Sequence, residues 1–368
     1  MRPPRKVLLA CGGTGGHIFP AFSLAEELKA RDPGIDVLYV CGNKDIENAI
    51  FKMVAGQRIA SVESAPFRGA LSLLKPSFLI KLIMGFSQAF KLLRRERPDV
   101  VVGFGGHYSF PVVLMARLAG ARVLLHEQNV APGMANRWLV RVVYGVALSF
   151  EETKQYLPRH GNVRVTGNPI RVAIEKDCRD EALRFFNFSE DKKTLLVLGG
   201  SQGAESINSL FLQCLPHLAE SMRKKIQVLH LCGRLETGQA EATLKEWGVT
   251  GRAFSFFERM DLAYAVADLA LGRAGATFLA EISAKKIPAI LMPYPFGDGH
   301  QFRNAEVFSR HHESLVMRQG EVTPQALAEA LEQRLLKISE RAGERHPAQA
   351  SSGARALLAD FVIECASR

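Results

Sequence analysis

The chain contains 368 residues, of which 47% are hydrophobic and 23% are charged, and its formal net charge is +10. These values describe a soluble globular protein that is long enough for two domains, and they exclude extensive disorder. The positive excess indicates an anionic partner, which is a nucleic acid, a membrane surface or a phosphorylated substrate.

The six cysteines are scattered along the chain without the close spacing that metal ligands require. We therefore expect reduced, mostly buried thiols rather than a disulfide framework. We expect no metal site either, because the chain has no HExxH motif, no cysteine–histidine cluster and no Asp-x-Asp pair. The N-terminus, residues 1–6, is basic, but only a short apolar stretch follows it, which predicts no cleaved signal peptide and a cytoplasmic protein.

The first half of the chain alternates short apolar runs with longer helical patterns. The runs that predict strands are 7–10, 37–41, 100–103, 122–126, 146–149 and 163–166. The patterns that predict helices are 19–30, 78–95, 110–118 and 134–140.

The alternation restarts after residues 167–169. The predicted strands of the second half are 194–198, 226–231, 253–256, 269–271, 289–292 and 314–317. Its predicted helices are 204–218, 237–247, 262–267, 276–284, 301–310, 324–337 and 352–365. Because strands that alternate with helices form parallel sheets, we predict an α/β protein with two doubly wound, Rossmann-like domains. Ligands then bind at the carboxyl ends of the strands, and the deepest cleft would lie between the domains.

Three glycine-rich turns directly follow predicted strands, at residues 12–16, 103–106 and 199–203. Glycine lets a backbone turn sharply and approach another molecule, and the helix N-terminus beyond such a turn favours an anion. The first turn is neither a dinucleotide fingerprint, because Ile18 stands where the third glycine of GxGxxG belongs, nor a P-loop. It ends at His17, which places an acid–base group at the mouth of the turn.

Polar residues close further strands, and each has two readings. In the sequence His-Glu-Gln-Asn at 126–129, Glu127 or Asn129 binds a hydroxyl group or satisfies loop backbone groups. Ser201 either donates a hydrogen bond to a phosphate or is the N-cap of the helix. Arg171 is a clamp for a diphosphate or a surface arginine.

Two helices near the end of the second half carry similar candidates. Glu281, which lies inside the helix after residues 273–277, holds the hydroxyls of a ribose or is an ordinary exposed glutamate. Gln301 and Asn304 are suited to sugar contacts, because amides both donate and accept, or they cap the helix.

The segment from Arg68 to Arg97 carries seven basic residues against one acidic residue, Glu96. Residues 78–93 within it combine apolar and basic side chains but are too short and too interrupted to span a bilayer. They fit a helix on an anionic membrane surface with its tip at residues 73–83, a half-buried helix of the first domain, or both.

The ordered set of motifs resembles the MurG family, the UDP-N-acetylglucosamine–N-acetylmuramyl-(pentapeptide) pyrophosphoryl-undecaprenol N-acetylglucosamine transferases. The motifs that carry the resemblance cover nearly the whole chain and lie at 12–17, 103–106, 126–129, 167–171, 199–203, 273–281 and 300–301. The resemblance implies the glycosyltransferase B fold. It implies an acceptor-binding, membrane-associating domain at 1–166, a UDP-sugar-binding domain at 167–349, and a helix within 350–368 that crosses back to the first domain.

The activity implied by the resemblance is inverting transfer of N-acetylglucosamine to the C4 hydroxyl of the N-acetylmuramoyl moiety of lipid I, which gives lipid II for peptidoglycan synthesis. The reaction would take place at the cytoplasmic face of the inner membrane, with the enzyme bound peripherally. Neither a cofactor nor a nucleic acid is implied.

Matching positions imply the site residues. The residues expected to contact UDP-N-acetylglucosamine are Thr14, Gly15, Gly16, Asn129, Arg171, Ser201, Gln202, Phe257, Ala276, Thr277, Glu281 and Gln301. Of these, Arg171 and Ser201 would hold the diphosphate, Phe257 the uracil by its backbone, Glu281 the ribose and Gln301 the sugar. The residues expected at the acceptor are Gly12, Gly13, Gly105, Gly106 and His107. The residues expected at the membrane are Lys75, Phe78, Leu79, Leu82, Ile83 and Phe86. His107 and Phe257 depart from the family's commonest residues, which are tyrosine and an aliphatic residue.

For the reaction we expect a metal-independent displacement in which His17 accepts the proton of the acceptor hydroxyl, with Glu127 as the rival base. Arg171 and the helix after Gly203 would stabilise the departing UDP. The alternatives are a UDP-N-acetylglucosamine epimerase or another lipid glycosyltransferase of the same fold. A nicotinamide dehydrogenase is disfavoured by Ile18, and a membrane-bound scaffold leaves the three glycine turns unexplained.

Overall fold

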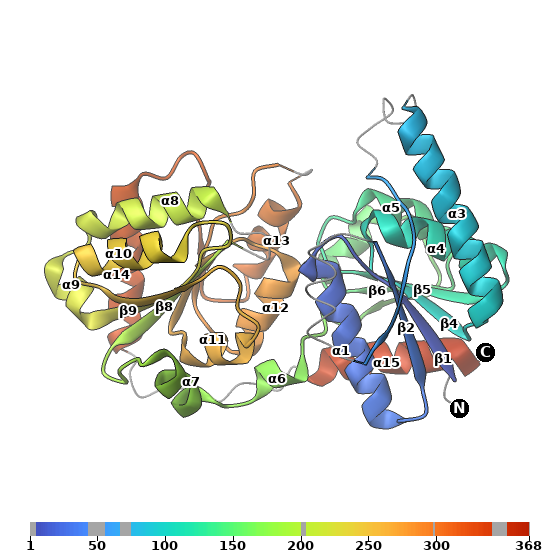
Figure 1. Ribbon diagram of the computed structural model, residues 1–368, viewed down its shortest axis with the longest axis horizontal. Coiled ribbons are helices and arrows are strands. Elements are labelled where there is room, and N and C mark those ends of the chain that lie inside the picture. Colours follow the sequence, from blue (N-terminus) through green and yellow to red (C-terminus); the bar gives the residue numbers. More distant parts are fainter. Residues whose placement is uncertain are drawn as a thin grey trace. The chain divides into compact units, whose positions relative to one another are not determined.

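The computed structural model describes residues 5–42, 56–66, 75–199, 204–296, 299–340 and 352–367 (Figure 1). The chain divides into two units. The N-terminal unit comprises residues 1–171 and 351–368, and the C-terminal unit comprises residues 172–350. Each unit is a parallel sheet with helices on its faces, so the predicted pair of doubly wound α/β domains is confirmed.

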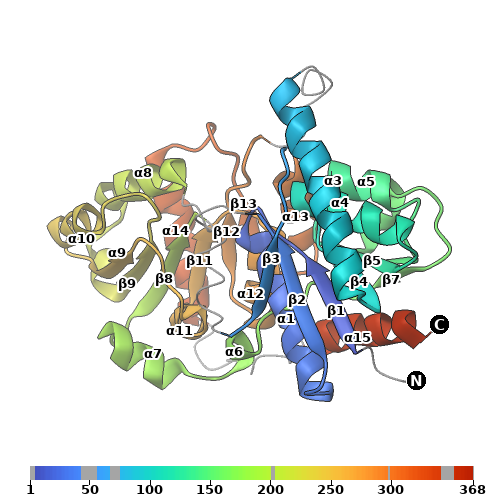
Figure 2. The ribbon, with the colours of Figure 1, turned by 45° about the vertical axis from the view of Figure 1, so that its right-hand side comes forward.

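Within its described residues, the N-terminal unit contains one seven-stranded parallel sheet in the order β3-β2-β1-β4-β5-β6-β7 (Figure 2). The strands are β1 (Lys6–Ala10), β2 (Asp36–Cys41), β3 (Arg58–Ser61), β4 (Val100–Gly103), β5 (Arg122–Glu127), β6 (Gly145–Leu148) and β7 (Val163–Val165). The chain leaves β1 toward β2 on one side and returns to β4 on the other, so the strand order reverses between β1 and β4. In doubly wound sheets this reversal point is where ligands bind.

Two layers of helices cover this sheet. The helices of the unit are α1 (Gly15–Arg31), α3 (Pro76–Glu96), α4 (Gly106–Leu118), α5 (Met134–Leu139), the 3₁₀ helix η2 (Glu151–Tyr156) and α15 (Ser352–Ser367). Helices α1 and α15 share a core with β1, β2 and β4, whereas α3, α4 and α5 bury their apolar sides in a second core.

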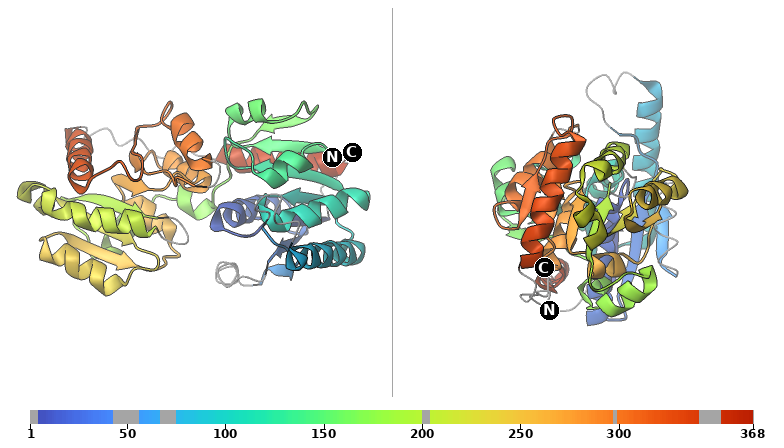
Figure 3. Two further views of the ribbon diagram at one scale, coloured as in Figure 1. Left: turned by 90° about the horizontal axis from the view of Figure 1, so that it is seen from above. Right: turned by 90° about the vertical axis from the view of Figure 1, so that its left-hand side faces the viewer.

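Helix α15 ends the chain but belongs to the N-terminal unit, where it is drawn in red (Figure 3). Its apolar stripe, which includes Leu358, Phe361 and Val362, is fully buried in the core of the first sheet. Arg355 donates a hydrogen bond of 2.9 Å to the carbonyl of Ile170. The contact lies next to the end of the first segment of the N-terminal unit. That segment extends to Arg171, five residues beyond the predicted boundary at residue 166.

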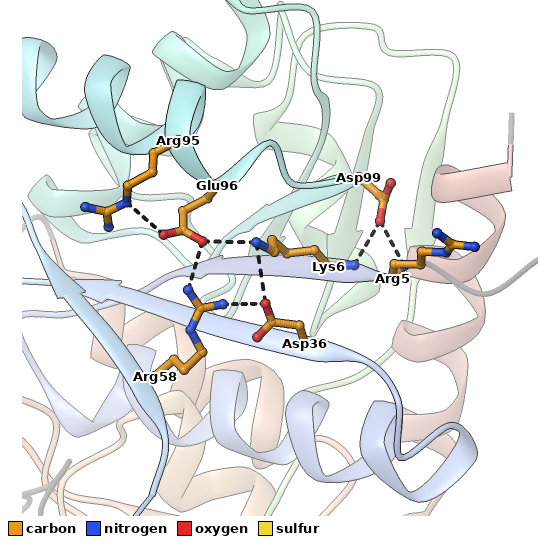
Figure 4. A network of polar contacts seen from close by, with 7 residues as sticks. All are labelled: Arg5, Lys6, Asp36, Arg58, Arg95, Glu96 and Asp99. Atoms are coloured by element: carbon orange, nitrogen blue, oxygen red, sulfur yellow. Dashed lines mark hydrogen bonds and ion pairs between the residues drawn. The ribbon is translucent and has the colours of Figure 1, made fainter.

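A network of charges joins the amino ends of β1 and β2 to the end of α3 (Figure 4). The Glu96 carboxylate accepts hydrogen bonds from Lys6 (3.1 Å), Arg58 (2.9 Å) and Arg95 (3.0 Å), and Arg58 also pairs with Asp36. Burial raises the pKa of Glu96, but the three cations more than offset that effect and hold the pKa at about 2. Glu96 is therefore ionised in the folded protein at any pH near neutrality.

The C-terminal unit contains, in the part of the chain described, a six-stranded parallel sheet in the order β10-β9-β8-β11-β12-β13. Its strands are β8 (Lys193–Leu198), β9 (Ile226–Leu231), β10 (Thr250–Phe254), β11 (Leu269–Gly272), β12 (Ala289–Leu291) and β13 (Ser314–Val316). Its helices are α6 (Val172–Glu175), α7 (Arg179–Phe186), α8 (Glu205–Cys214), η3 (Leu215–His217), α9 (Glu220–Lys225), α10 (Thr237–Glu246), α11 (Met260–Val266), α12 (Ala276–Ala284), α13 (His300–Phe308) and α14 (Pro324–Glu340). The order reverses between β8 and β11, which repeats the arrangement of the first sheet.

The structure corrects some predicted elements. Strand β3 was not predicted, because its residues lie exposed at the edge of the sheet and lack an apolar run. Helix α1 begins at Gly15, not at residue 19, because the glycine turn itself supplies the first helical turn. The short helices α6, α7 and α9 were also not predicted. The expectation of buried thiols is confirmed, since no disulfide joins the six cysteines, all of which are described, and five of them are buried.

Candidate functional site

The two glycine turns of the N-terminal unit meet at the carboxyl ends of β1 and β4. Gly105 and Gly106 have φ angles of +86° and +75°, a region that side chains other than glycine rarely adopt. A Cβ atom on Gly106 would lie 2.9 Å from the carbonyl oxygen of Gly12, so the two backbones touch where only glycine fits. The turns therefore form one continuous backbone surface, which begins the helices α1 and α4.

His17 lies in the first turn of α1 against this surface. A Cβ atom on Gly105 would lie 3.5 Å from Cε1 of His17, and one on Gly106 would lie 3.5 Å from its Cδ2. Nδ1 of the imidazole is 3.0 Å from Oε1 of Gln128, which lies in the loop after β5. The structure thus brings the glycines predicted at the acceptor together with the predicted base.

Thr14 is the exposed residue before α1, and its side chain makes no capping hydrogen bond. Gly15 is buried as the first residue of the helix, and Gly16 is half-buried. The ring of His107, in the first turn of α4, packs at 4.1 Å from that of Tyr108, and its carbonyl accepts a hydrogen bond of 2.8 Å from Ser64.

Glu127 is buried at the end of β5 and organises the loop that follows. One carboxylate oxygen accepts hydrogen bonds from the backbone N–H (2.9 Å) and the side-chain amide (3.2 Å) of Asn129. The other accepts from the backbone N–H of Gly133 (3.1 Å) and the amide of Asn136 (2.8 Å). Both oxygens accept hydrogen bonds from structural donors. These contacts agree with the prediction that Glu127 satisfies groups of the loop.

Arg171 is the last residue of the first segment of the N-terminal unit. Its guanidinium lies over the ring of Phe19 in α1, 4.3 Å from the ring centroid. Stacking on an aromatic ring holds a guanidinium in one orientation, and a planar guanidinium is the group that binds anions at two points.

In the C-terminal unit the predicted phosphate loop lies at the strand-order reversal, after β8. Its residues 200–203, which include Ser201 and Gln202, fall outside the described residues. The neighbouring strand β11 runs into Arg273, which is buried and donates to the carbonyls of Met292 (2.9 Å) and Pro293 (3.3 Å) and to the hydroxyl of Ser206 (2.9 Å). Burial lowers the pKa of Arg273. Arg273 joins three segments around this end of the sheet, a role that the sequence alone did not reveal.

Helix α12 starts directly after that turn, with Ala276 and Thr277 buried in its first turn. Glu281, one turn further, is buried, and its Oε2 accepts a hydrogen bond of 2.7 Å from the hydroxyl of Tyr264. The reading of Glu281 as an ordinary exposed helix residue is therefore wrong. A buried carboxylate held by a tyrosine is a pre-oriented acceptor.

Two further predicted contacts lie near α13. Gln301 is half-buried, and its Oε1 accepts a hydrogen bond of 2.9 Å from the backbone N–H of Tyr294. Asn304 is fully buried and donates to the carbonyl of Ala274 (3.2 Å), so it supports the turn before α12 and does not face solvent.

Phe257 packs among Phe186 and Phe254, with ring centroids 5.3 and 4.8 Å away, which fixes the backbone after β10.

The first turns of α3 carry an exposed apolar surface. The α3 apolar face consists of Leu79, Ile80, Ile83 and Met84, with the exposed Lys75 and Lys81 beside it. Of the other residues predicted to touch a membrane, Phe78 is only 8% exposed, Leu82 is half-buried, and Phe86 packs on Phe110. The prediction was therefore partly wrong about which residues of the helix are exposed. Ile80 and Met84 are exposed, whereas Phe78 is buried and Phe86 is half-buried. Residues 73 and 74 of the predicted tip lie outside the described residues.

Among the described residues, no group of three or more His, Cys, Asp or Glu side chains is arranged to hold a metal ion. Nowhere in the described ranges does a helix combine the length and the apolarity needed to cross a bilayer.

Comparison with known proteins identifies the family. The glycosyltransferase family 28 N-terminal domain matches residues 7–148, and the family's C-terminal domain matches residues 194–360. A Halothermothrix orenii protein named UDP-N-acetylglucosamine–N-acetylmuramyl-(pentapeptide) pyrophosphoryl-undecaprenol N-acetylglucosamine transferase is 40% identical over 337 residues, which are 89% of this chain and 90% of the relative. A Geobacter protein of the same name is 35% identical over 96% of this chain and 92% of its own.

The chain belongs to the MurG family of glycosyltransferase family 28. Its structure is similar to that of Acinetobacter baumannii MurG, with a TM-score of 0.72, 26% identity and coverage of 98% of this chain and 100% of the other. The MurG-family assignment and the glycosyltransferase B fold expected from the motifs are thus confirmed.

The same fold occurs outside the MurG family. A Listeria monocytogenes protein described as a UDP-N-acetylglucosamine 2-epimerase has a TM-score of 0.67 at 12% identity over 98% of this chain and 96% of its own, which shows likeness of fold alone. Fold by itself therefore does not separate a transferase from an epimerase.

Proposed function

We propose that this glycosyltransferase transfers N-acetylglucosamine from UDP-N-acetylglucosamine to the C4 hydroxyl of the N-acetylmuramoyl moiety of lipid I, with inversion, and so forms lipid II for peptidoglycan synthesis. The observation that carries the proposal is the similarity of 35–40% identity, over most of the chain, to proteins named for this transfer. The site geometry of the N-terminal unit supports it, because a histidine lies beside a glycine backbone surface at the strand-order reversal.

His17 acts as the base in this proposal. As the C4 oxygen forms its bond to the anomeric carbon, the imidazole takes the hydroxyl proton and the bond from that carbon to UDP breaks. The four hydrogen bonds on Glu127 favour His17 over Glu127, because a carboxylate whose two oxygens are committed to loop donors is poorly available to a substrate proton. Glu127 instead keeps the loop after β5 in place beside His17.

The donor is proposed to bind at the β8–β11 reversal of the C-terminal unit. Glu281 would accept the ribose hydroxyls, and the backbone near Phe257 would meet the uracil. Arg171 and Ser201 would hold the diphosphate, and their positive charge and hydrogen-bond donors would stabilise UDP as it leaves. The remaining donor contacts are assigned to Thr14, Gly15, Gly16, Asn129, Gln202, Ala276, Thr277 and Gln301.

The acceptor is proposed to bind on the N-terminal unit. Backbone N–H groups at Gly12, Gly13, Gly105 and Gly106 can approach its diphosphate closely, because no side chain intervenes. His107 would line the same surface. The α3 apolar face and the lysines beside it would rest on the anionic cytoplasmic leaflet, where a lipid-linked acceptor is available.

The proposal is tested by His17→Ala assayed with UDP-N-acetylglucosamine and a lipid I analogue. Turnover is expected to fall roughly a hundredfold or more, the size of a lost general base, whereas binding of UDP-N-acetylglucosamine is expected to persist. Near-normal turnover by the variant would contradict the assignment of the base. The epimerase alternative predicts consumption of the donor without any acceptor.

A further inference from the structure

A series of three hydrogen bonds leads from a backbone carbonyl to His17. Nε2 of His126 lies 3.1 Å from the carbonyl oxygen of Gly167, and its Nδ1 lies 2.9 Å from Nε2 of Gln128. Oε1 of Gln128 lies 3.0 Å from Nδ1 of His17. His126 is fully buried and Gln128 is 2% exposed, so the bond between these two side chains is shielded from water.

The direction of each bond follows from the first. A carbonyl oxygen only accepts, so His126 must carry its proton on Nε2 when it binds Gly167. A neutral His126 then has a bare Nδ1, which accepts a hydrogen from the amide NH₂ of Gln128. The opposite end of that amide is an oxygen, which also only accepts, and His17 must therefore be protonated at Nδ1.

The orientation of the Gln128 amide is fixed by a second contact. Its Nε2 also donates to the backbone carbonyl of His126 at 3.0 Å, so both amide hydrogens have acceptors. If the amide were reversed, its oxygen would face that carbonyl and the bare Nδ1 of His126, which are both acceptors. Two repulsive contacts would replace two hydrogen bonds, so the reversed amide is excluded.

We propose that Gln128, held by His126, is a positioning residue that keeps His17 protonated at Nδ1 and so leaves Nε2 bare to take the acceptor's proton. This inference rests on the proposed function, because it assigns a catalytic purpose to the tautomer of His17. In the reaction, the bare Nε2 receives the hydroxyl proton while Nδ1–H keeps donating to Gln128. The Gln128 carbonyl thereby stabilises the imidazolium until it releases the proton to solvent.

The burial of His126 keeps the donor and acceptor roles in this series of hydrogen bonds unchanged near neutral pH. Burial lowers the pKa of His126 to about 4, with a smaller contribution from the nearby His17 and an opposing one from the bond to Gly167. His126 therefore stays neutral, and its Nδ1 remains an acceptor.

The tautomer of His17 can be read directly by ¹⁵N NMR of the full chain labelled at histidine. Nδ1–H and Nε2–H imidazoles give different ¹⁵N shifts, and the His17 signals are those that His17→Ala removes. We expect Nδ1–H in the native protein and loss of that preference in Gln128→Leu. Nε2–H in the native protein, or an unchanged tautomer in Gln128→Leu, would overturn the positioning role whatever the activity. Gln128→Met, whose unbranched side chain fills the same space, serves if the leucine variant does not fold.

Kinetics then separate a positioning role from a structural one. Gln128→Leu is expected to lower kcat roughly a hundredfold or more, since a misplaced proton on a catalytic histidine is that costly, with little change in KM for UDP-N-acetylglucosamine. The double variant His17→Ala/Gln128→Leu should be no slower than His17→Ala alone, because Gln128 acts through His17. An additional loss in the double variant would contradict the proposal.

Gln227 provides the matched control. It is a fully buried glutamine of β9 that also makes three hydrogen bonds, to the backbone N–H (2.9 Å) and carbonyl (2.8 Å) of Ser189 and to the hydroxyl of Thr194 (3.0 Å). Gln227→Leu should lose similar stability and keep its kcat, and a fall in kcat equal to that of Gln128→Leu would assign both effects to folding. If Gln128→Leu changes the tautomer but His17→Ala keeps its turnover, the base of the proposed function is wrong, and the catalytic purpose of the tautomer is wrong with it.

Discussion

The α3 apolar face gives a quantitative prediction about membrane association. Ile80 and Ile83 are 58% and 67% exposed, so together they present slightly more than one complete isoleucine side chain to a partner. Burying one such side chain in an apolar phase is worth about 1.5–3 kcal/mol, so their insertion is worth about 2–4 kcal/mol. At about 1.4 kcal/mol per tenfold change, Ile80→Ser/Ile83→Ser should weaken binding to vesicles roughly 30- to 700-fold.

The assay is sedimentation with vesicles that contain anionic lipid, at low and at physiological ionic strength. The control is Leu118→Ser, because Leu118 is 71% exposed and is the last residue of α4, just before the amino end of β5, whereas the α3 apolar face lies in the first turns of α3. The control should bind as the native protein does, and both variants should still bind UDP-N-acetylglucosamine. Native-like vesicle binding by the double variant would refute the argument that this face meets the lipid.

Three further predictions concern the donor, the charge network and the glycine turns. Glu281→Gln should raise KM for UDP-N-acetylglucosamine roughly 10- to 150-fold with a small change in kcat, because a hydrogen bond to a charged group contributes about 1.5–3 kcal/mol; an unchanged KM would remove Glu281 from the donor site. Glu96 has a pKa lowered from 4.5 to about 2, so its stabilisation is complete above pH 4.5 and is lost as the pH falls to about 2. Glu96→Gln should therefore lose about 3 kcal/mol near neutrality and abolish this part of the acid dependence of urea unfolding, and an unchanged acid dependence would contradict the assignment. Gly106→Ala and Gly120→Ala both place alanine at positive φ and should each lose about 1–2 kcal/mol of stability, but only Gly106→Ala meets the carbonyl of Gly12 and should also lose turnover.

The sequence predicted those features that depend on local patterns. Short apolar runs followed by glycine mark the ends of β1 and β4, and the chain order places these ends together in any doubly wound sheet. His17 could be singled out because it ends the first glycine turn.

The features that were missed depend on contacts between distant residues. His17 and Gln128 are 111 residues apart, and no sequence pattern indicates that the amide of Gln128 would face the imidazole. The sequence left Glu127 as a rival base, a hydroxyl ligand or a group that satisfies the loop, because its four donors are seen only in the folded loop. In α3, Phe78 and Ile80 are equally apolar in the sequence, and only packing decides that the first is buried and the second exposed.

The proposed function requires a transferase that needs a lipid-linked acceptor, with His17 as its base. The most direct test follows UDP release and disaccharide–lipid product from UDP-N-acetylglucosamine with and without a lipid I analogue, for the native protein and for His17→Ala. The proposed function predicts product only with the acceptor. It also predicts that His17→Ala lowers the rate roughly a hundredfold or more. Donor turnover without acceptor, or an equal rate in both proteins, would contradict it.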